Sequence, residues 1–143
     1  MIIGQLALIA AAFYAGLAIY INLVEQPARL SLDNQGLLSQ WKVSYTRGHV
    51  MGASTASITG LLGITAFVVS HNWFYLIAAG LILTNWPYTL AFIMPINKKI
   101  LATPTETANH ETRNFIEKWA NLHAVRSLLG IAATILFLLA VNH

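Results

Sequence analysis

Four long apolar segments dominate this chain, and they restrict its fold more than any other feature. They run over Ile2–Val24, Val50–Ser70, Trp73–Met94 and Trp119–Val141, and none has an Asp or Glu in its interior. Each is near the roughly 20 residues that cross a bilayer core as a helix. Lipid offers no partner for free backbone groups, so helices are predicted rather than open strands. The sequence therefore predicts an all-α integral membrane four-helix bundle, with residues 1–143 as a single domain.

Composition supports a membrane environment. Hydrophobic residues make up 57% of the chain and charged residues only 9%, whereas soluble domains carry roughly 25% charge. The net charge is only +3, and no basic patch with interleaved aromatic residues is present, which argues against a nucleic-acid partner. The expected partners are membrane lipid and a small hydrophobic molecule. Whether the chain also forms a homo-oligomer is left open by the sequence.

The distribution of basic residues predicts the orientation in the membrane. Only His71 and Asn72 separate the second and third apolar segments, whereas Glu25–His49 and Pro95–Lys118 form two long links. Those links share one side, and all eight Lys and Arg residues lie in them or close by in the fourth segment. The positive-inside rule makes that side cytoplasmic and puts both termini outside. A bacterial inner membrane is the expected location.

Both links contain helical signals. Asp33 is predicted to cap an amphipathic interfacial helix between the first two spans. The apolar face of that helix would carry Leu37, Leu38, Trp41 and Tyr45. In the second link, Thr103 to Glu106 has the pattern of a capping box with Pro104 at the first helical position. The fourth helix is therefore expected to begin well before Trp119.

Helical spacing directs several polar side chains toward the bundle interior. Small residues allow close helix approach, so the faces that carry them are expected to be internal. The inward polar and aromatic set comprises Asn22, Glu25, His49, Asn85, Tyr88, Trp119, His123 and Arg126, with Asn97 just beyond the third span. All lie near the predicted cytoplasmic side. An ionisable residue inside a membrane costs about 2.5–3.5 kcal/mol on insertion scales, which points to a partner or a function.

Several interpretations of this polar group remain open. Glu25 and Arg126 can form an ion pair that only fixes helix register. In an acid–base site, His49 or His123 would accept a proton, Glu25 would orient the imidazole and Arg126 would stabilise an oxyanion. Alternatively, His49 and His123 would ligate haem or a metal ion, with Glu25 as a third metal ligand. A membrane binding or scaffold protein without chemistry is the remaining alternative.

Two motifs carry a family resemblance. The first is Asn85-Trp86-Pro87-Tyr88-Thr89-Leu90 followed by Met94-Pro95-Ile96-Asn97, and the second is Trp119-Ala120-Asn121-Leu122-His123-Ala124-Val125-Arg126. Together they resemble the anthrone oxygenase-like family of small membrane proteins. The resemblance implies oxidation of an anthrone to an anthraquinone by dioxygen, with no added organic cofactor. It also implies roles for the matching residues Tyr88, Asn97, Trp119, His123 and Arg126.

The combined prediction favours an anthrone oxygenase-like oxidoreductase that acts on a hydrophobic phenolic compound in a polar pocket. No cofactor is predicted, with haem or a metal ion as the alternative. The expected catalytic residues are His123, Arg126, Glu25 and His49. The expected substrate-binding residues are Asn22, Asn85, Tyr88, Asn97 and Trp119.

Overall fold

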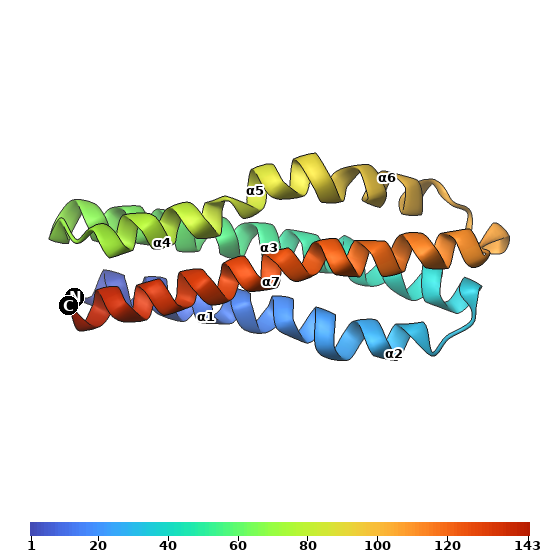
Figure 1. Ribbon diagram of the computed structural model, residues 1–143, viewed down its shortest axis with the longest axis horizontal. Helices are drawn as coiled ribbons and strands as arrows, with labels where there is room; N and C mark the ends of the chain where they lie inside the picture. The colour runs from blue at the N-terminus through green and yellow to red at the C-terminus, as the bar shows by residue number, and fades with distance from the viewer.

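The computed structural model describes residues 1–143 and is helical almost throughout (Figure 1). The first helical run joins α1 (Ile2–Tyr20), the π-helical turn η1 (Ile21–Glu25) and α2 (Gln26–Leu30). The second run is the single helix α3 (Asn34–Ser70). The third joins α4 (Trp73–Leu83), α5 (Asn85–Tyr88), the π-helical turn η2 (Thr89–Ile93) and α6 (Met94–Ala102). After the 3₁₀ turn η3 (Thr105–Thr107), α7 (His110–Asn142) is the fourth run.

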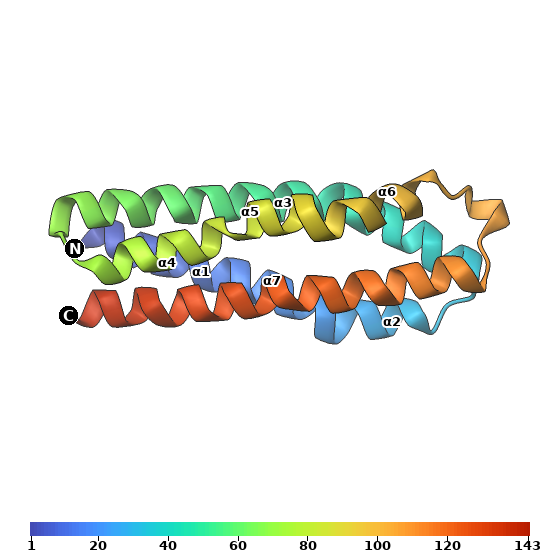
Figure 2. The same ribbon diagram turned by 45° about the horizontal axis from the view of Figure 1, so that its top comes forward.

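The four runs pack as a bundle of antiparallel neighbours. Both termini lie at one end, and the two links lie at the other (Figures 1 and 2). The predicted four-helix architecture is confirmed, because all four runs are long and apolar enough to cross a membrane. The runs exceed the predicted spans: 37 residues of α3 extend about 55 Å at 1.5 Å per residue, against a bilayer core of about 30 Å. They can therefore extend beyond the hydrocarbon core at the link end.

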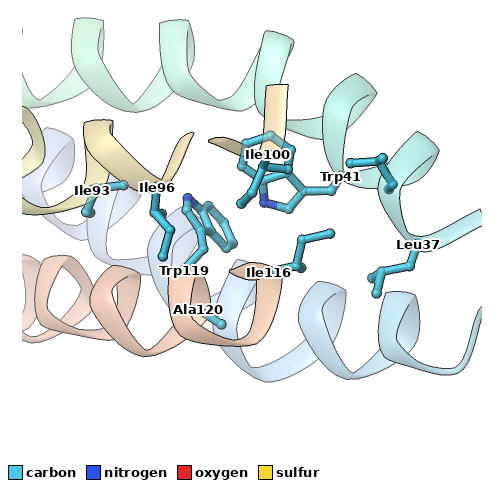
Figure 3. Packing of buried hydrophobic residues seen from close by; sticks show 9 residues of the cluster. Leu37, Trp41, Ile93, Ile96, Ile100, Ile116, Trp119 and Ala120 are labelled. Atoms are coloured by element: carbon cyan, nitrogen blue, oxygen red, sulfur yellow. The ribbon is translucent and has the colours of Figure 1, made fainter. Parts of the chain in front are cut away.

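The amphipathic helix predicted between the first two spans is present, but it is not separate from the second span. Residues 34–70 form one uninterrupted helix. Leu37, Leu38 and Trp41 are fully buried in a hydrophobic cluster whose other members come from α6, α7 and η2 (Figure 3). Apolar side chains from the other helices, rather than lipid headgroups, cover this face. The predicted cap is confirmed, since the Asp33 carboxylate accepts a hydrogen bond of 2.8 Å from the Gly36 amide.

The fourth helix begins before Trp119 as expected, but a different capping box starts it. Asn109 accepts a hydrogen bond of 3.1 Å from the Thr112 amide, and the Thr112 hydroxyl accepts the reciprocal bond from the Asn109 amide. Residues 105–107 form only the short turn η3. The predicted capping box at residues 103–106 is therefore wrong, because the Asn109 pair satisfies the first free amides of α7 instead.

Small residues bring the helices together in the half of the bundle near the termini. A methyl group added at Gly63 would lie 2.9 Å from the Ala79 Cβ and 2.8 Å from the Phe137 ring. The close-packed cluster here is completed by Ala7, Ala11, Ala66, Tyr75, Ala78 and Ala140. Tight packing of small side chains is the usual source of helix association in lipid.

The third run loses this regular packing at α5. Pro87 has no N–H to offer the Leu83 carbonyl, so the helical hydrogen-bond ladder is interrupted there. The turn η2 then follows, directly before α6 with Pro95 in its first turn. Figure 1 shows the chain departing from the line of α4 where α5 begins. Proline and π-helical turns are established causes of such bends, and here they accompany a cavity beside α3.

Candidate active site in the bundle cavity

A cavity of about 150 Å³ lies among all four helical runs. Its long wall on α3 extends from Ser44 to Ala56, and α5, η2 and α6 face that wall. Two exposed apolar side chains of the third run, Trp86 and Leu90, also line the cavity. The polar and aromatic lining residues are Tyr14, Arg29, Ser44, Tyr45, His49, Asn85, Trp86, Thr89, Asn97, Trp119, His123 and Arg126.

His123 is held in the cavity wall by Asn22. The Asn22 amide nitrogen donates to the Ala120 carbonyl at 2.9 Å, which turns its Oδ1 toward the histidine. This oxygen lies 2.8 Å from His123 Nδ1 and accepts a second hydrogen bond from Ser127 at 2.9 Å. An oxygen that only accepts requires the hydrogen to be on Nδ1, which leaves Nε2 with the lone pair. The geometry thus prepares the buried His123 as a base at Nε2.

Arg126 has no carboxylate partner. Its Nε donates to the Tyr14 hydroxyl at 3.1 Å, and the guanidinium lies 5.8 Å from the centre of the Tyr14 ring. Gly52 leaves space for the far end of this group, because a Cβ there would be 3.1 Å from Nη2. The single salt bridge of the molecule is elsewhere, so the predicted Glu25–Arg126 pair is wrong. Arg126 is a half-buried cation that borders the cavity without a counter-ion.

Glu25 pairs instead with Arg29, one helical turn later, at 2.8 Å. The carboxylate also accepts hydrogen bonds from Ser44 and, at 3.1 Å, from Gln40. Glu25 does not line the main cavity and does not contact an imidazole, so the role predicted for it as the group that orients the histidine belongs to Asn22. Helix positions determine this outcome: Glu25 lies on the same face as Arg29, four residues away.

Arg29 is the most deeply buried charge of the protein, at 2% exposure. Its guanidinium donates to Ser44 at 3.2 Å and lies 5.7 Å from the centre of the Trp119 ring. Sequence reasoning placed Arg29 only among the basic residues of a link and missed its position in the cavity wall. The spacing of four residues from Glu25 was the available signal.

The other predicted site residues divide into two groups. Asn85, Asn97, Trp119 and His49 line the cavity, and the first three are buried. His49 is exposed on the rim, where its ring stacks on Tyr45 and its Nδ1 lies 2.8 Å from the Tyr45 carbonyl. His49 was expected to point inward, and it does line the cavity, but at an exposed position on the rim.

Tyr88 and Asn22 do not belong to the lining set. The Tyr88 hydroxyl donates to the Leu122 carbonyl at 2.9 Å, which ties the bent third run to α7. Asn22 acts behind His123, as described above. Both predicted substrate-binding residues therefore occupy supporting positions in this arrangement, and neither borders the cavity.

Tyr14, Ser44 and Tyr45 are lining residues that sequence reasoning did not assign to the site. Tyr14 lies three residues after Ala11 and four before Ala18, so it shares the small-residue face of α1. That spacing was a usable signal for an inward tyrosine. Ser44 and Tyr45 gave none, because their segment was predicted to lie at the membrane surface.

Unpartnered polar atoms concentrate at this cavity. Six buried side-chain nitrogen or oxygen atoms of the protein lack a hydrogen-bond partner. Three of them belong to lining residues: Nε of Arg29, Oδ1 of Asn85 and Oδ1 of Asn97. Each of these three atoms is covered by surrounding protein atoms, so it is the residues and not these particular atoms that line the cavity.

The fold and the site define a class: a small four-helix membrane-type protein with an internal cavity that combines an oriented imidazole, a free guanidinium and apolar walls. Comparison with known proteins is more specific. The family model described as anthrone oxygenase matches residues 41–136, and this chain belongs to that family. No solved structure matches the chain.

Curated relatives agree with the family assignment. An anthrone oxygenase of Claviceps purpurea is 28% identical over 91% of this chain and 83% of its own length. The anthrone oxygenase tpcL of Aspergillus fumigatus is 32% identical over 91% of this chain and 87% of its own length. The monooxygenase hypC of Dothistroma septosporum is 26% identical over 73% of this chain and 62% of its own length. These relatives are fungal, so they do not support the expected bacterial inner membrane.

Proposed function

We propose that the cavity is the active site of an oxygenase that converts an anthrone-type multi-ring phenol to the corresponding quinone. The observation that carries this proposal is the pair formed by His123, with its free Nε2, and Arg126, which lacks a carboxylate. The family membership and the names of the relatives favour oxygen chemistry. The apolar lining residues favour a hydrophobic substrate.

The reaction begins with proton removal. His123 Nε2 takes a proton from the CH₂ carbon of the central ring and leaves a carbanion delocalised onto the ring oxygen. This proton transfer needs a base within hydrogen-bond reach of the carbon-bound hydrogen. Asn22 stabilises the resulting imidazolium, because its Oδ1 accepts the Nδ1–H hydrogen bond at 2.8 Å.

Dioxygen then completes the oxidation. The carbanion transfers one electron to O₂, and the two radicals combine to form a C–O bond. The peroxide takes the proton held by His123, and loss of water from the hydroperoxide leaves a C=O group. Overall, CH₂ and O₂ yield C=O and H₂O, so dioxygen supplies both oxygen atoms and the substrate supplies the electrons. These steps require no resident cofactor.

Arg126 supplies electrostatic stabilisation in this scheme. Proton removal places negative charge on the ring oxygen, and a cation in a low-dielectric site stabilises such a charge strongly. The Tyr14 hydroxyl fixes the guanidinium through Nε, while the space beside Gly52 accommodates its outer nitrogen. An Arg126 already paired with Glu25 would contribute much less.

The proposal extends to substrate entry and membrane orientation. The exposed apolar side chains Trp86 and Leu90 lie on the outer side of the cavity, where the bent third run passes α3. A hydrophobic ring compound would enter there from the membrane. The basic residues of the link end favour a cytoplasmic position for that end, with both termini on the opposite side.

The substitution His123→Asn tests the proposal. Asparagine retains a nitrogen donor toward Asn22 but has no equivalent of Nε2. We expect loss of anthrone-dependent oxygen uptake by detergent-purified protein, with little change in the thermal melting temperature. His110→Ala, at the exposed start of α7, is the matched control and should retain full uptake. Full uptake in His123→Asn would exclude His123 as the base, and no uptake by the wild type would contradict the anthrone assignment.

A second candidate function follows from the two histidines of the cavity. In both His49 and His123 the Nδ1 atom faces an acceptor oxygen, so Nε2 remains available to ligate haem or a metal ion. No group of three His, Asp or Glu side chains forms a metal site, so any ion would have few protein ligands. An absorption spectrum and elemental analysis of the purified protein test this candidate. A Soret band or stoichiometric metal would make the histidines ligands.

A further inference from the structure

The cavity has a thin wall formed by α3 and the third helical run. Three of its lining residues are exposed at the surface: His49 on α3, and Trp86 and Leu90 on the third run. The lining residues on the first and fourth runs are all buried or half-buried. A side chain that borders a cavity and is also exposed forms a wall only one side chain thick. The least movement therefore opens the cavity between α3 and the third run.

Side chains rather than backbone close this wall. The helix α4 packs closely along α3, whereas the backbones of α5, η2 and α6 do not. Pro87 and the π-helical turn accompany the bend of the third run away from the line of α4 (Figure 1). On the α3 side, four of the lining residues are small: Gly48, Gly52, Ala53 and Ala56. Their size leaves space that the longer side chains of the third run cover.

The thin wall lies at the depth of the hydrocarbon core. Trp86 and Leu90 belong to the apolar segment Trp73–Met94, and Ala53 belongs to Val50–Ser70. Apolar segments of this length are those that cross a bilayer. The side chains of Trp86 and Leu90 are 44% and 58% exposed, so in a membrane their outer surfaces would contact lipid tails. An apolar compound dissolved in the bilayer would meet the cavity through this wall.

Trp86 differs from the other two exposed residues because it is hydrogen-bonded to the opposite helix. Its indole N–H donates to the Ser57 hydroxyl of α3 at 3.1 Å. The Ser57 hydroxyl donates its own hydrogen to the Ala53 carbonyl at 2.9 Å, which leaves its oxygen free to accept from the indole. His49 instead stacks on Tyr45 of its own helix. A single hydrogen bond therefore connects the exposed part of the third run to α3.

The backbone around Trp86 is fixed, so its side chain is the part that can move. Asn85 is buried, and its amide nitrogen donates to the Ile82 carbonyl at 2.9 Å. The Tyr88 hydroxyl donates to the Leu122 carbonyl of α7 at 2.9 Å. Exposed side chains change rotamer within picoseconds to nanoseconds once they are free of such bonds. Rotation of the indole would open the wall without any loss of helical structure.

We propose that Trp86 is a gate residue and that its hydrogen bond to Ser57 is the latch that keeps the gate closed. The compound that passes the gate is a flat apolar ring compound dissolved in the hydrocarbon core. Rotation of the indole away from Ser57 admits the compound between α3 and the third run. The latch then closes over the occupied cavity and separates the reacting carbon from the surroundings. This gate rests on the proposed function, which places a ring compound in the same cavity.

The rate at which a bound ring compound leaves the cavity tests the gate without any requirement for turnover. Full-length detergent-purified protein is loaded with 9,10-anthraquinone and mixed rapidly with an excess of empty phosphatidylcholine vesicles, which take up the released compound. Trp119 is 6% exposed and lines the cavity, so its fluorescence should recover only when the compound leaves. Release requires an open gate, so its rate reports the open fraction.

Two variants remove the latch from opposite sides. Ser57→Ala removes the acceptor and Trp86→Phe removes the donor, while each keeps a side chain of similar shape. A neutral hydrogen bond changes an equilibrium constant by about 2- to 13-fold, so each variant should release the compound faster by about that factor. Ser57→Ala should have no further effect when Trp86 is already replaced by Phe, because both changes remove the same bond. Ser54→Ala is the matched control, since the Ser54 hydroxyl bonds only within α3, and it should release at the wild-type rate.

The outcomes separate the gate from the proposed reaction. Release at the wild-type rate in both folded variants, or independent effects of the two changes, would overturn the latch, whereas anthrone turnover by the wild type would still support the oxygenase. Latch-dependent release without anthrone turnover would support the gate and contradict the oxygenase. Failure of the wild type to bind 9,10-anthraquinone would overturn both proposals.

Discussion

The position of Arg126 depends on one hydroxyl group, and Tyr14→Phe removes it with little other change. Phenylalanine keeps the ring that packs against Gly130, where an added Cβ would lie only 2.9 Å from Tyr14 Cδ1. It also keeps the ring face that the guanidinium approaches at 5.8 Å. The variant loses the 3.1 Å hydrogen bond from Arg126 Nε. Tyr14 does not need to touch the reacting atoms to act, so it is a positioning residue in this scheme.

The expected effect follows from the strength of that bond. A hydrogen bond to a charged group contributes about 1.5–3 kcal/mol, and each 1.4 kcal/mol corresponds to a factor of ten in rate. If half or more of this energy holds Arg126 toward the developing oxyanion, kcat should fall about 3- to 140-fold. KM should change little, because the negative charge forms only after the substrate is bound.

Steady-state oxygen uptake with anthrone measures both constants, and Tyr75→Phe is the matched control. Tyr75 is 3% exposed and packs closely on Gly4, but it has no contact with a charged residue. A purely structural effect of the lost hydroxyl would reduce the melting temperature in both variants and leave kcat of the folded protein unchanged. Unchanged kcat in Tyr14→Phe, or equal losses in the two variants, would refute the positioning role.

Three further predictions concern packing and charge. Gly63→Val should lower the free energy of unfolding by about 1–3 kcal/mol, because the new Cβ meets Ala79 and Phe137. At Gly80 an added Cβ meets no atom within 4 Å, so Gly80→Val should cost less. Thermal melts in detergent compare the stabilities of the two variants. Arg29→Met should destabilise the folded protein by about 3 kcal/mol, since it leaves the half-buried Glu25 carboxylate without its cation. Adding Glu25→Gln to this variant should recover part of the lost stability. The absence of any recovery would argue against a stabilising Glu25–Arg29 pair. Arg126→Met leaves no carboxylate unpaired, so oxygen uptake should fall while the melting temperature stays near that of the wild type; a large loss of stability would indicate a structural ion instead.

Helix number and the approximate spans were predictable from sequence because the bilayer imposes a local rule. About 20 apolar residues must form a helix wherever they meet lipid, so Ile2–Val24 or Trp119–Val141 can be assigned without knowledge of their neighbours. The same reasoning failed for residues 34–49. Their amphipathic pattern fits a helix on a membrane surface equally well as one whose apolar face packs against α6 and α7. The difference depends on contacts with Ile100 and Ile116, which are distant in sequence.

Part of the site could also be predicted from the local sequence pattern. Helical periodicity placed His123, Arg126 and Asn85 on internal faces, and the structure brings them to one cavity. Periodicity does not identify partners, however, because a change of one turn along a neighbouring helix is enough to replace one contact by another. Glu25 therefore meets Arg29 rather than Arg126, and Asn22 rather than Glu25 meets His123.

The sequence by itself determined the four long apolar helices of this protein and most of their internal faces, since these follow from hydrophobicity and from 3.6 residues per turn. Tertiary structure alone decided which polar groups remain free. Arg126 lacks a counter-ion because Glu25 is used by Arg29, and the buried Asn85 oxygen meets no donor from any of the helices around it. Whether a buried group has a partner depends on the three-dimensional distance to every other group, and no local pattern specifies that distance.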